Sequence, residues 1–332
     1  MKVIFFHRKP RPNVNFSVEN LFVSIRNAFS SAVRWEVKQL SYYSEGFFKR
    51  LYLCIEAMRG QKGINHITGD INFIAIFLRK KYTVLTILDV GFMNHPNRWA
   101  RLLLRWFWII LPVKRSAVVT TISGSTKQEL LKYVKTDPDR IKVIYVPIAS
   151  GFSAAPKTFN KSQPTILQVG TKPNKNATRL VQALQGISCR LEIIGEVNDS
   201  LAKELEKAGI TYASSKNLSP EAIVAKYRDA DIIAFVSTYE GFGMPIVEAN
   251  ATGRVVVTSN LLSMPEVAGN AAHLVDPFDV LSIRNGILKV IEDDVYREQL
   301  IINGFENRKR FEATRIAEQF TEIYQSLDDK KK

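Results

Sequence analysis

Short apolar runs rich in β-branched residues recur along this chain, at intervals that leave room for a helix between them. This alternation is typical of a parallel sheet whose strands are joined by crossover helices. In the first half, strands are predicted at residues 2–6, 64–67, 82–87, 117–122 and 142–146. In the second half, the clearest are predicted at residues 165–169, 190–194, 231–236 and 254–258. The pattern therefore predicts an α/β protein.

The length of the chain predicts two domains. It has 332 residues, and a domain usually holds roughly 100 to 200. Residues 154–163 form a polar, proline-bearing segment that is typical of a linker. We therefore expect a first domain over residues 1–153 and a second over residues 164–307. A final segment, residues 306–327, carries apolar residues at helical spacing, which predicts an amphipathic helix.

The cysteines and the apolar segments bear on the compartment. The only two cysteines, Cys54 and Cys189, lie far apart and form no CxxC pattern, so neither a disulfide framework nor a zinc site is indicated. The N-terminal apolar run is too short for a signal peptide. Residues 102–112 are interrupted by Arg105 and fall short of the roughly 20 residues that a membrane span requires. We expect a cytoplasmic protein without a transmembrane helix.

The positive charge of the chain is confined to its first half. The net charge is +14, with 46 Lys and Arg against 32 Asp and Glu. Residues 1–150 hold 24 basic and 9 acidic residues, or +15, which leaves 22 and 23, or −1, for the rest. This excess suggests an anionic partner for the first half: a membrane surface, a phosphorylated lipid or nucleic acid. A basic surface that serves only solubility is the alternative.

Residues 97–116 combine three arginines, Arg98, Arg101 and Arg105, with three of the chain's four tryptophans. A basic, aromatic helix of this kind can lie in a membrane interface. It can equally be an ordinary domain helix whose wide apolar face packs in the core. The charge of the first half favours membrane association slightly.

The segment over residues 231–259 is the most informative for function. A predicted buried strand leads into a turn in which Gly241 and Gly243 would let a ligand approach the backbone closely. Pro245 suits the first position of a short helix, and Gly253 suits the position just after its end. The free backbone N–H groups at the start of such a helix form an anion site, most naturally for phosphate.

Two glutamates, Glu240 and Glu248, flank this turn and can face one cleft. In a doubly wound sheet that cleft lies outside the carboxyl ends of the strands, where ligands bind. One carboxylate would then lie near the ligand's sugar, and the other would accept hydrogen bonds from a ribose diol. For Glu248 a purely structural reading is also open, because the helix dipole favours an acidic residue near a helix start.

The motif E-G-F-G-M-P-I-V-E, residues 240–248, resembles the signature of family 4 glycosyltransferases. The following segment agrees with that family at Ser263, Pro265, Glu266, Gly269, Asp276 and Pro277. The resemblance implies the GT-B fold: two facing Rossmann-like domains with parallel sheets, and a C-terminal helix, residues 308–328, that crosses back to the N-terminal domain. It also implies that residues 1–153 bind the acceptor and residues 164–307 bind the nucleotide sugar.

A second region, residues 166–184, is also similar to the family, in which a glycine is followed by basic residues. Here Lys172 and Lys175 follow Gly170, and an ammonium group at this point could neutralise a diphosphate. Lys172 stands where the family often has arginine, which makes Lys175 the safer assignment. Lysines in turns are otherwise mostly solvated.

The resemblance implies a retaining transfer of a sugar from a nucleoside diphosphate to a hydroxyl acceptor, here a surface polysaccharide or glycolipid precursor. The candidate catalytic residues are Glu240, Lys175 and Lys172. The candidate donor-binding residues are Gly170, Gly241, Phe242, Gly243, Met244, Pro245 and Glu248. No metal or other cofactor is expected, because the resemblance implies that backbone amides and basic side chains stabilise the departing diphosphate. The expected partners are a nucleotide-sugar donor, a glycan or lipid-linked acceptor and, peripherally, an anionic membrane; nucleic acid is not expected.

Two departures from the family concern the first half. The first predicted strand is followed by HRKPRPNVNFSVEN rather than by a glycine-rich loop, and Leu88-Asp89 stands where many members have His-Asp. Either His66 or Asp89 replaces that histidine, or the acceptor site is built differently and His66 is structural. Leu88 keeps a second reading open, that of an inactive transferase scaffold that binds anionic lipid or nucleic acid. A nicotinamide-dependent oxidoreductase is disfavoured, because no G-x-G-x-x-G follows the first strand.

Overall fold

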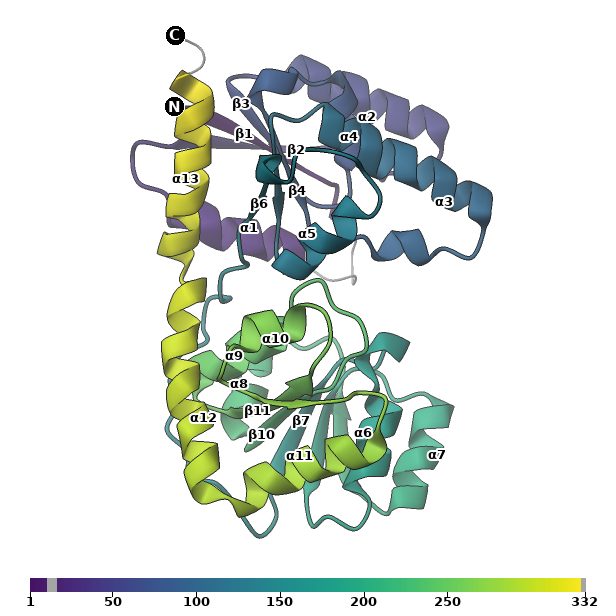
Figure 1. Cartoon of the computed structure of the whole chain (residues 1–332), viewed down its shortest axis with the longest axis vertical. Coiled ribbons are helices and arrows are strands. Elements are labelled where there is room, and N and C mark those ends of the chain that lie inside the picture. The colour runs from purple at the N-terminus through teal and green to yellow at the C-terminus, as the bar shows by residue number, and fades with distance from the viewer. Residues whose placement is uncertain (11–16, 330–332) are drawn as a thin grey trace. The chain divides into compact units, whose positions relative to one another are not determined.

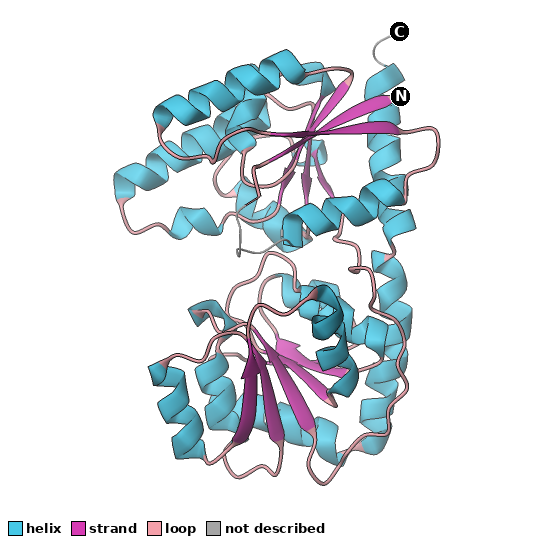
Figure 2. Ribbon diagram, turned by 180° about the vertical axis from the view of Figure 1, so that it is seen from behind, coloured by secondary structure: helices cyan, strands magenta, loops and turns pink. Residues whose placement is uncertain are grey.

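The computed structural model of the chain describes the backbone of residues 1–10 and 17–329. It describes the side chains of residues 1–10 and 21–329. Most of the segment after the first strand, where the family's glycine-rich loop is missing, thus lies outside the described residues. The chain divides into two compact units (Figures 1 and 2). The first comprises Met1–Pro147 and Ala313–Lys332, and the second comprises Ile148–Glu312.

The first unit contains a six-stranded parallel sheet in the order β2-β1-β3-β4-β5-β6. Its strands are β1 (Lys2–His7), β2 (Arg34–Gln39), β3 (Ile64–Ile67), β4 (Thr83–Ile87), β5 (Val118–Thr121) and β6 (Ile141–Val143). Its α-helices are α1 (Ser17–Asn27), α2 (Phe47–Gly60), α3 (Arg98–Leu104), α4 (Leu111–Lys114), α5 (Gly124–Leu131) and α13 (Ala313–Asp329). Short helical turns are η1 (Asn72–Phe77), η2 (Lys80–Tyr82), η3 (Gly91–Asn94) and η5 (Pro138–Arg140), and η4 (Arg105–Ile110) is a π-helical segment.

Helix α13, the last of the chain, belongs to the core of the first unit. Its buried residues Ile316, Phe320 and Tyr324 share a hydrophobic cluster with Phe5 of β1 and Phe22 of α1. The other face of this sheet is covered by a second cluster that includes residues of α2, η1 and α4. The C-terminal segment therefore returns to the N-terminal unit, as the resemblance implied.

The prediction of one continuous helix over residues 306–327 is wrong. Helix α12 ends at Asn307, the turn η7 (Arg308–Phe311) follows, and Glu312 is extended at φ −69° and ψ 136° before α13 begins. Phe311 does not join the apolar stripe of α13. It packs edge-on against Phe242 in the second unit, with ring centroids 5.7 Å apart.

The second unit contains a six-stranded parallel sheet in the order β12-β11-β10-β7-β8-β9. Its strands are β7 (Thr165–Val169), β8 (Arg190–Ile194), β9 (Thr211–Ser215), β10 (Ile232–Phe235), β11 (Val255–Ser259) and β12 (His273–Val275). Its helices are η6 (Pro173–Lys175), α6 (Ala177–Leu184), α7 (Asp199–Ala208), α8 (Pro220–Asp229), α9 (Met244–Thr252), α10 (Ser263–Ala268), α11 (Val280–Glu292) and α12 (Asp294–Asn307). The fold class is confirmed: α/β, with two Rossmann-like units and a returning C-terminal helix.

Three observed strands were not predicted from the sequence, and all three lie at sheet edges. They are β2 in the first unit and β9 and β12 in the second. Strand β2, for example, is almost entirely exposed, with the sequence RWEVKQ. Interior parallel strands are buried on both faces and read as apolar runs, whereas an edge strand need not be apolar.

Residues 154–163 contain no helix or strand, but they do not form a free linker. Lys157 pairs with the buried carboxylate of Asp231 at 2.7 Å. The guanidinium of Arg297 lies over the ring of Phe159 at 3.9 Å. The segment is thus bound to the surface of the second unit. Within the described part of the chain, no helix is both long and apolar enough to cross a membrane.

Candidate functional site

The candidate site lies where the strand order of the second sheet reverses. β7 and β10 are neighbours in the middle of the sheet, but the chain leaves β7 towards β8 on one side and leaves β10 towards β11 on the other. In open α/β sheets, ligands bind outside the carboxyl ends of the strands at such a reversal. The loop after β7 contains Gly170 and Lys175, and the loop after β10 contains Glu240 and Gly243.

These two loops are joined by hydrogen bonds and an ion pair. The backbone N–H of Thr238 donates to the carbonyl of Asn174 at 2.8 Å. The amide of Asn174 in turn donates to the carbonyl of Tyr239 at 3.0 Å and to Glu240 Oε1 at 3.3 Å. Lys175 Nζ lies 2.6 Å from the same Glu240 oxygen. Two candidates that are 65 positions apart in the sequence are therefore in direct contact.

Lys175 is held firmly but not enclosed. Its side chain is 21% exposed and that of Glu240 is 16% exposed, and its ammonium group also lies 4.9 Å from the centre of the Phe235 ring. Gly170 makes this placement possible. It adopts φ +87°, and a Cβ added there would lie 3.0 Å from Lys175 Cγ. A side chain at position 170 would be strained by the backbone and would press on the lysine.

Asn176 is a structural residue of the site that the sequence did not reveal. It is buried, has a left-handed φ of 59°, and is the residue from which α6 starts. Its amide donates to the carbonyls of Val236 at 3.0 Å and Pro277 at 2.7 Å. Asn176 thus ties the start of α6 to the end of β10. Asparagine tolerates left-handed backbone, but only the tertiary structure shows which carbonyls it binds.

Helix α9 begins directly after the second of these loops, without a capping side chain. Its N-cap is Gly243, at φ +117°, and Gly253 follows the helix at φ +74°, as predicted. Pro245 is the second helical residue rather than the first. Phe242, a candidate donor-binding residue, has a side chain that is only 4% exposed and packs on Phe311. Any contact that Phe242 makes with a ligand would therefore be made by its backbone.

Glu248 lies on the second turn of α9, partly buried. Its Oε2 accepts a hydrogen bond of 2.5 Å from the hydroxyl of Tyr227, which is completely buried. Burial raises the pKa of Glu248 to about 7, and this rise is opposed by the Tyr227 hydrogen bond and by the charge of Lys175. The positive charge of Lys175 favours the ionised form of Glu248. Tyr227 was not predicted.

Two further residues named from the sequence, Lys172 and Ser263, have different surroundings. Lys172 is exposed and makes no ion pair with a described residue, so it does not share the constrained position of Lys175. Ser263, at the start of α10, donates a hydrogen bond of 3.0 Å to the carbonyl of Glu240. The S-x-x-P-E segment therefore supports the loop that carries Glu240.

His66, considered as a replacement for the missing histidine, lies in the core of the first unit. Its Nδ1 bonds to the Tyr324 hydroxyl at 2.6 Å and its Nε2 to the Thr86 hydroxyl at 2.7 Å. Burial lowers its pKa to about 3, so the ring is neutral and both nitrogens are occupied. Of the two readings of His66, the structural one fits. Asp89 is exposed and accepts a hydrogen bond from the backbone N–H of Gly91 at 2.9 Å.

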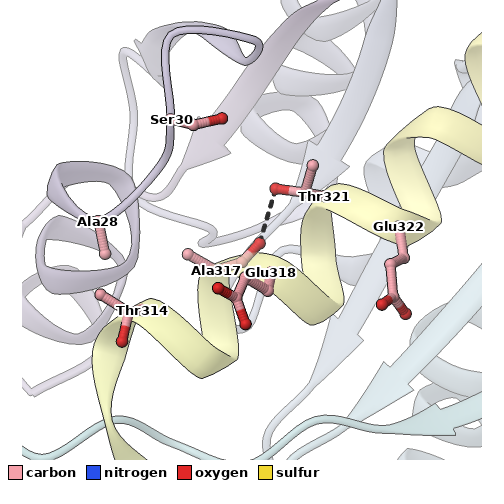
Figure 3. A pocket seen from close by; sticks show the side chains of 7 residues that line it. All are labelled: Ala28, Ser30, Thr314, Ala317, Glu318, Thr321 and Glu322. Carbon is pink, nitrogen blue, oxygen red and sulfur yellow. Dashed lines mark hydrogen bonds between the residues drawn. The ribbon is translucent and has the colours of Figure 1, made fainter.

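A shallow pocket in the first unit contains none of the candidate residues. It lies between α13 and the loop after α1 and is lined by Ala28, Ser30, Thr314, Ala317, Glu318, Thr321 and Glu322 (Figure 3). Among the residues that the structure describes, no group of three or more His, Cys, Asp and Glu side chains is placed to hold a metal ion.

The second unit, which contains the candidate residues, is similar in sequence to known glycosyltransferases. Residues 152–307, which contain every candidate side chain described above in the second unit, match the family model described as glycosyl transferases group 1. The O-antigen chain mannosyltransferase B of Escherichia coli is 28% identical over 274 residues, which cover 75% of this chain and 71% of the relative. The serotype-specific mannosyltransferase WbdA of E. coli is 24% identical over 65% of this chain, but the match covers only 30% of WbdA.

Solved structures share the fold at low sequence identity. The crystal structure of Anabaena HepE in complex with UDP and glucose has a TM-score of 0.77 and 16% identity, and covers 98% of this chain and 100% of HepE. This likeness concerns the fold, since the identity is low. It confirms the GT-B class to which the sequence motif pointed.

Proposed function

We propose that this chain, which belongs to the group 1 glycosyltransferases, transfers a sugar with retention from a nucleoside diphosphate to a hydroxyl of a surface polysaccharide or glycolipid precursor. The names of the E. coli relatives support mannose as the first sugar to test. The complex of HepE with UDP and glucose supports a nucleotide-sugar donor. In the reaction, the bond between the anomeric carbon and the diphosphate breaks, and a bond from that carbon to the acceptor oxygen forms.

The contact between Lys175 and Glu240 carries this proposal. A lysine ammonium has three N–H donors, and Glu240 takes one of them at 2.6 Å. We assign the remaining donors to the diphosphate, which gains negative charge as it leaves. A cation that is already fixed in place stabilises such a leaving group without reorganising during the reaction. Glu240, beside it, would contact the transferred sugar.

The start of α9 would supply the second source of positive potential. Backbone N–H groups at a helix start point outwards and favour a phosphate, and Gly243 offers no capping side chain that would compete for them. Together with Lys175, this helix end would neutralise the diphosphate without a metal ion. The absence of a bound metal in the reaction is thus part of the proposal.

Glu248 would hold the nucleoside. Tyr227 binds its Oε2, which leaves Oε1 for the ribose hydroxyls. A carboxylate is a good acceptor for two vicinal hydroxyl groups, and the hydrogen bond from Tyr227 fixes its orientation. We assign acceptor binding to the first unit, together with peripheral contact between that basic unit and an anionic membrane.

A cytoplasmic location at the inner face of the membrane would suit this activity. Cys54 and Cys189 are buried free thiols, and burial raises their pKa values to about 12 and about 11. Such thiols are protonated and unreactive at neutral pH, which suits a reducing compartment.

Two measurements test the proposed function. A panel of nucleotide sugars that includes GDP-mannose and UDP-glucose should contain one that raises the unfolding temperature, because a ligand at 100 times its dissociation constant adds roughly 2.7 kcal/mol of stability. The same donor should release free nucleotide slowly in the absence of acceptor. If no donor in the panel stabilised the protein or released nucleotide, the alternative of an inactive scaffold would replace the proposed function.

A further inference from the structure

Helix α2 has two apolar faces, and only one of them packs on the core. Leu53, Cys54 and Ala57 are buried. On the opposite side, large apolar residues are between 38% and 83% exposed: Phe47, Phe48, Leu51, Tyr52 and Met58. A surface helix normally turns polar residues towards water on that side. Apart from an edge-on contact between the rings of Tyr52 and Tyr42, 5.2 Å apart, the second apolar face of α2 is therefore left largely uncovered by the described chain.

The neighbouring segment α3–η4 repeats this feature more regularly. Its exposed apolar residues follow the spacing i, i+3, i+4, i+7 and i+8, which places them on one side of a helix, and they are between 45% and 74% exposed: Trp99, Leu102, Leu103, Trp106 and Phe107. No residue of α3 is buried. Residues 97–116 contact the core through a different set of side chains: Ile109 and Val113 are buried in it, and Leu104, Trp108 and Ile110 pack against it while partly buried. The apolar stripe of this segment is thus not a core face.

The two helical segments that carry the exposed stripes lie next to each other. The guanidinium of Arg50 on α2 stacks on the ring of Trp108 in η4, with 4.8 Å between them, and Figures 1 and 2 both show α2 beside α3 and its continuation. We use the name aromatic face for the ten exposed residues of both stripes: Phe47, Phe48, Leu51, Tyr52, Met58, Trp99, Leu102, Leu103, Trp106 and Phe107.

The charges around the aromatic face are mostly positive, and its two carboxylates already have partners: Glu45 pairs with Lys49 at 3.8 Å, and Glu56 accepts hydrogen bonds from Ser41. Residues 97–116 contain five basic residues and no acidic residue. Arg101 and Arg105 donate to the backbone carbonyls of His95 and Tyr133, at 3.3 Å and 3.0 Å, rather than to carboxylates. Their positive charge is therefore not neutralised by a described carboxylate. A surface of this kind, apolar with a basic border, complements anionic lipid.

We infer that the aromatic face docks on an anionic lipid bilayer, with its aromatic and leucine side chains inserted at the depth of the headgroups. Three leucines and a methionine favour lipid over single-stranded nucleic acid, since bases stack on aromatic rings and gain little from aliphatic side chains. The inference adds to the proposed function and rests on it for its biological purpose. A unit that is bound to the membrane lies close to a lipid-linked acceptor. The physical basis of the inference does not depend on catalysis.

Flotation with vesicles tests the inference on the full chain. Vesicles of phosphatidylglycerol and phosphatidylcholine in equal parts should bind the protein at least tenfold better than vesicles of phosphatidylcholine alone. Binding should weaken steeply as salt rises from about 0.1 M to about 1 M, because the Debye length falls from about 10 Å to about 3 Å. Equal binding to both vesicles, or no binding at low salt, would overturn the inference.

Substitutions distinguish this face from any other. The double variants Phe47→Ser/Phe48→Ser and Trp99→Ser/Trp106→Ser should each lose at least tenfold in binding. A matched control, Leu281→Ser/Val295→Ser, changes two apolar residues of the second unit that are 66% and 82% exposed, and it should bind as the parent does. All of these positions are exposed, so the unfolding temperature should change little; equal loss in the control would refute the assignment of the face.

Tryptophan fluorescence gives a second readout that does not depend on the serine variants. Brominated phosphatidylcholine mixed into the anionic vesicles should quench the emission, and Trp99→Phe/Trp106→Phe should remove most of that quenching while flotation is kept. Unchanged quenching in this variant would contradict insertion.

Other occupants of the aromatic face give different results. A concentration-dependent dimer that the serine variants abolish would identify a second copy of the chain, and tighter binding to single-stranded RNA than to the vesicles would identify nucleic acid; either would overturn the inference. Donor hydrolysis in the absence of lipid separates the two proposals. Nucleotide release without vesicle binding would refute only the membrane surface, whereas vesicle binding without nucleotide release would refute only the catalytic proposal.

Discussion

The basic residues of the candidate site in the second unit and those beside the aromatic face in the first unit have different partners. In the second unit, Lys175 is paired with Glu240 at 2.6 Å and is largely shielded from water. In the first unit, Arg101 and Arg105 are bonded only to backbone carbonyls among the described contacts. A cation held by a carboxylate has a fixed position, which suits catalysis on a single leaving group. Several cations without carboxylates leave a positive field, which suits a broad anionic surface.

A buried titratable side chain in each unit also differs in how many of its polar atoms are already hydrogen-bonded. His66 in the first unit is completely buried, and both of its ring nitrogens are bonded to other side chains. Glu248 in the second unit is only partly buried and has one oxygen bound by Tyr227. The first is closed to ligands, whereas the second retains an oxygen for them. Burial by itself thus does not mark a site; the remaining bonding capacity does.

The largest effect is expected from Lys175→Ala. Loss of a fixed group that stabilises the leaving diphosphate should lower kcat by about 100-fold to 1000-fold, or roughly 3 to 4 kcal/mol, with a smaller effect on KM. Steady-state kinetics with the donor found in the panel would measure this. A change in KM alone would refute the role of Lys175 at the leaving group.

A matched control for this substitution exists in the same unit. Lys226 pairs with Glu192 at 2.7 Å and is 28% exposed, so its geometry resembles that of Lys175, but it lies on α8. Lys226→Ala should leave kcat almost unchanged. An equal loss of kcat in both variants would mean that each lysine–glutamate pair affects activity by stabilising the fold and that Lys175 has no specific role in the reaction.

The second effect concerns pH. The pKa of Glu248 is about 7 in the folded protein and 4.5 as its ordinary value. Between these values the folded state keeps a proton that the unfolded state has lost. The free energy of unfolding should therefore fall as pH rises through this window, by on the order of 1 to 3 kcal/mol.

Glu248→Gln should remove this contribution, because an amide does not titrate. Unfolding temperatures of both proteins from about pH 4.5 to pH 8 would show the difference, and parallel curves would contradict the raised pKa. The donor KM of the variant should also increase, since it loses a carboxylate that we assign to the ribose.

A smaller effect, confined to the first unit, is expected from Tyr324→Phe. The change leaves His66 Nδ1 without its partner in the core, which should cost about 1 to 3 kcal/mol of stability. Donor affinity, measured by thermal shift, should not change, because the donor residues lie in the second unit. A weaker donor affinity would show that the core of the first unit affects donor binding, and would contradict the assignment of donor binding to the second unit alone.

The smallest effect is expected from Lys172→Ala. Its side chain is exposed and has no described ion pair, and exposed charges of this kind typically contribute below about 1 kcal/mol. We expect kcat/KM to fall by less than about fivefold. A loss as large as that of Lys175→Ala would show that Lys172 moves onto the diphosphate when the donor binds.

The sequence by itself determined the features that depend on neighbouring residues. Strands β3, β7 and β8 have the predicted bounds, because interior parallel strands are apolar on both faces and each therefore forms a distinct run. The turn at Gly243 and the helix end at Gly253 follow from local backbone requirements. The motif over residues 240–248 pointed to the group that the family model matches.

Only the tertiary structure decided which distant residues meet. Lys175 and Glu240 are 65 positions apart, and His66 and Tyr324 are 258 apart. No local pattern records such pairs, because they form only when the strands and helices that carry them are packed together. Tyr227 is one such residue: its place behind Glu248 depends on how α8 packs against α9. The exposure of the aromatic face was also undecided, since an apolar helical stripe has the same sequence pattern whether it meets the core or the solvent.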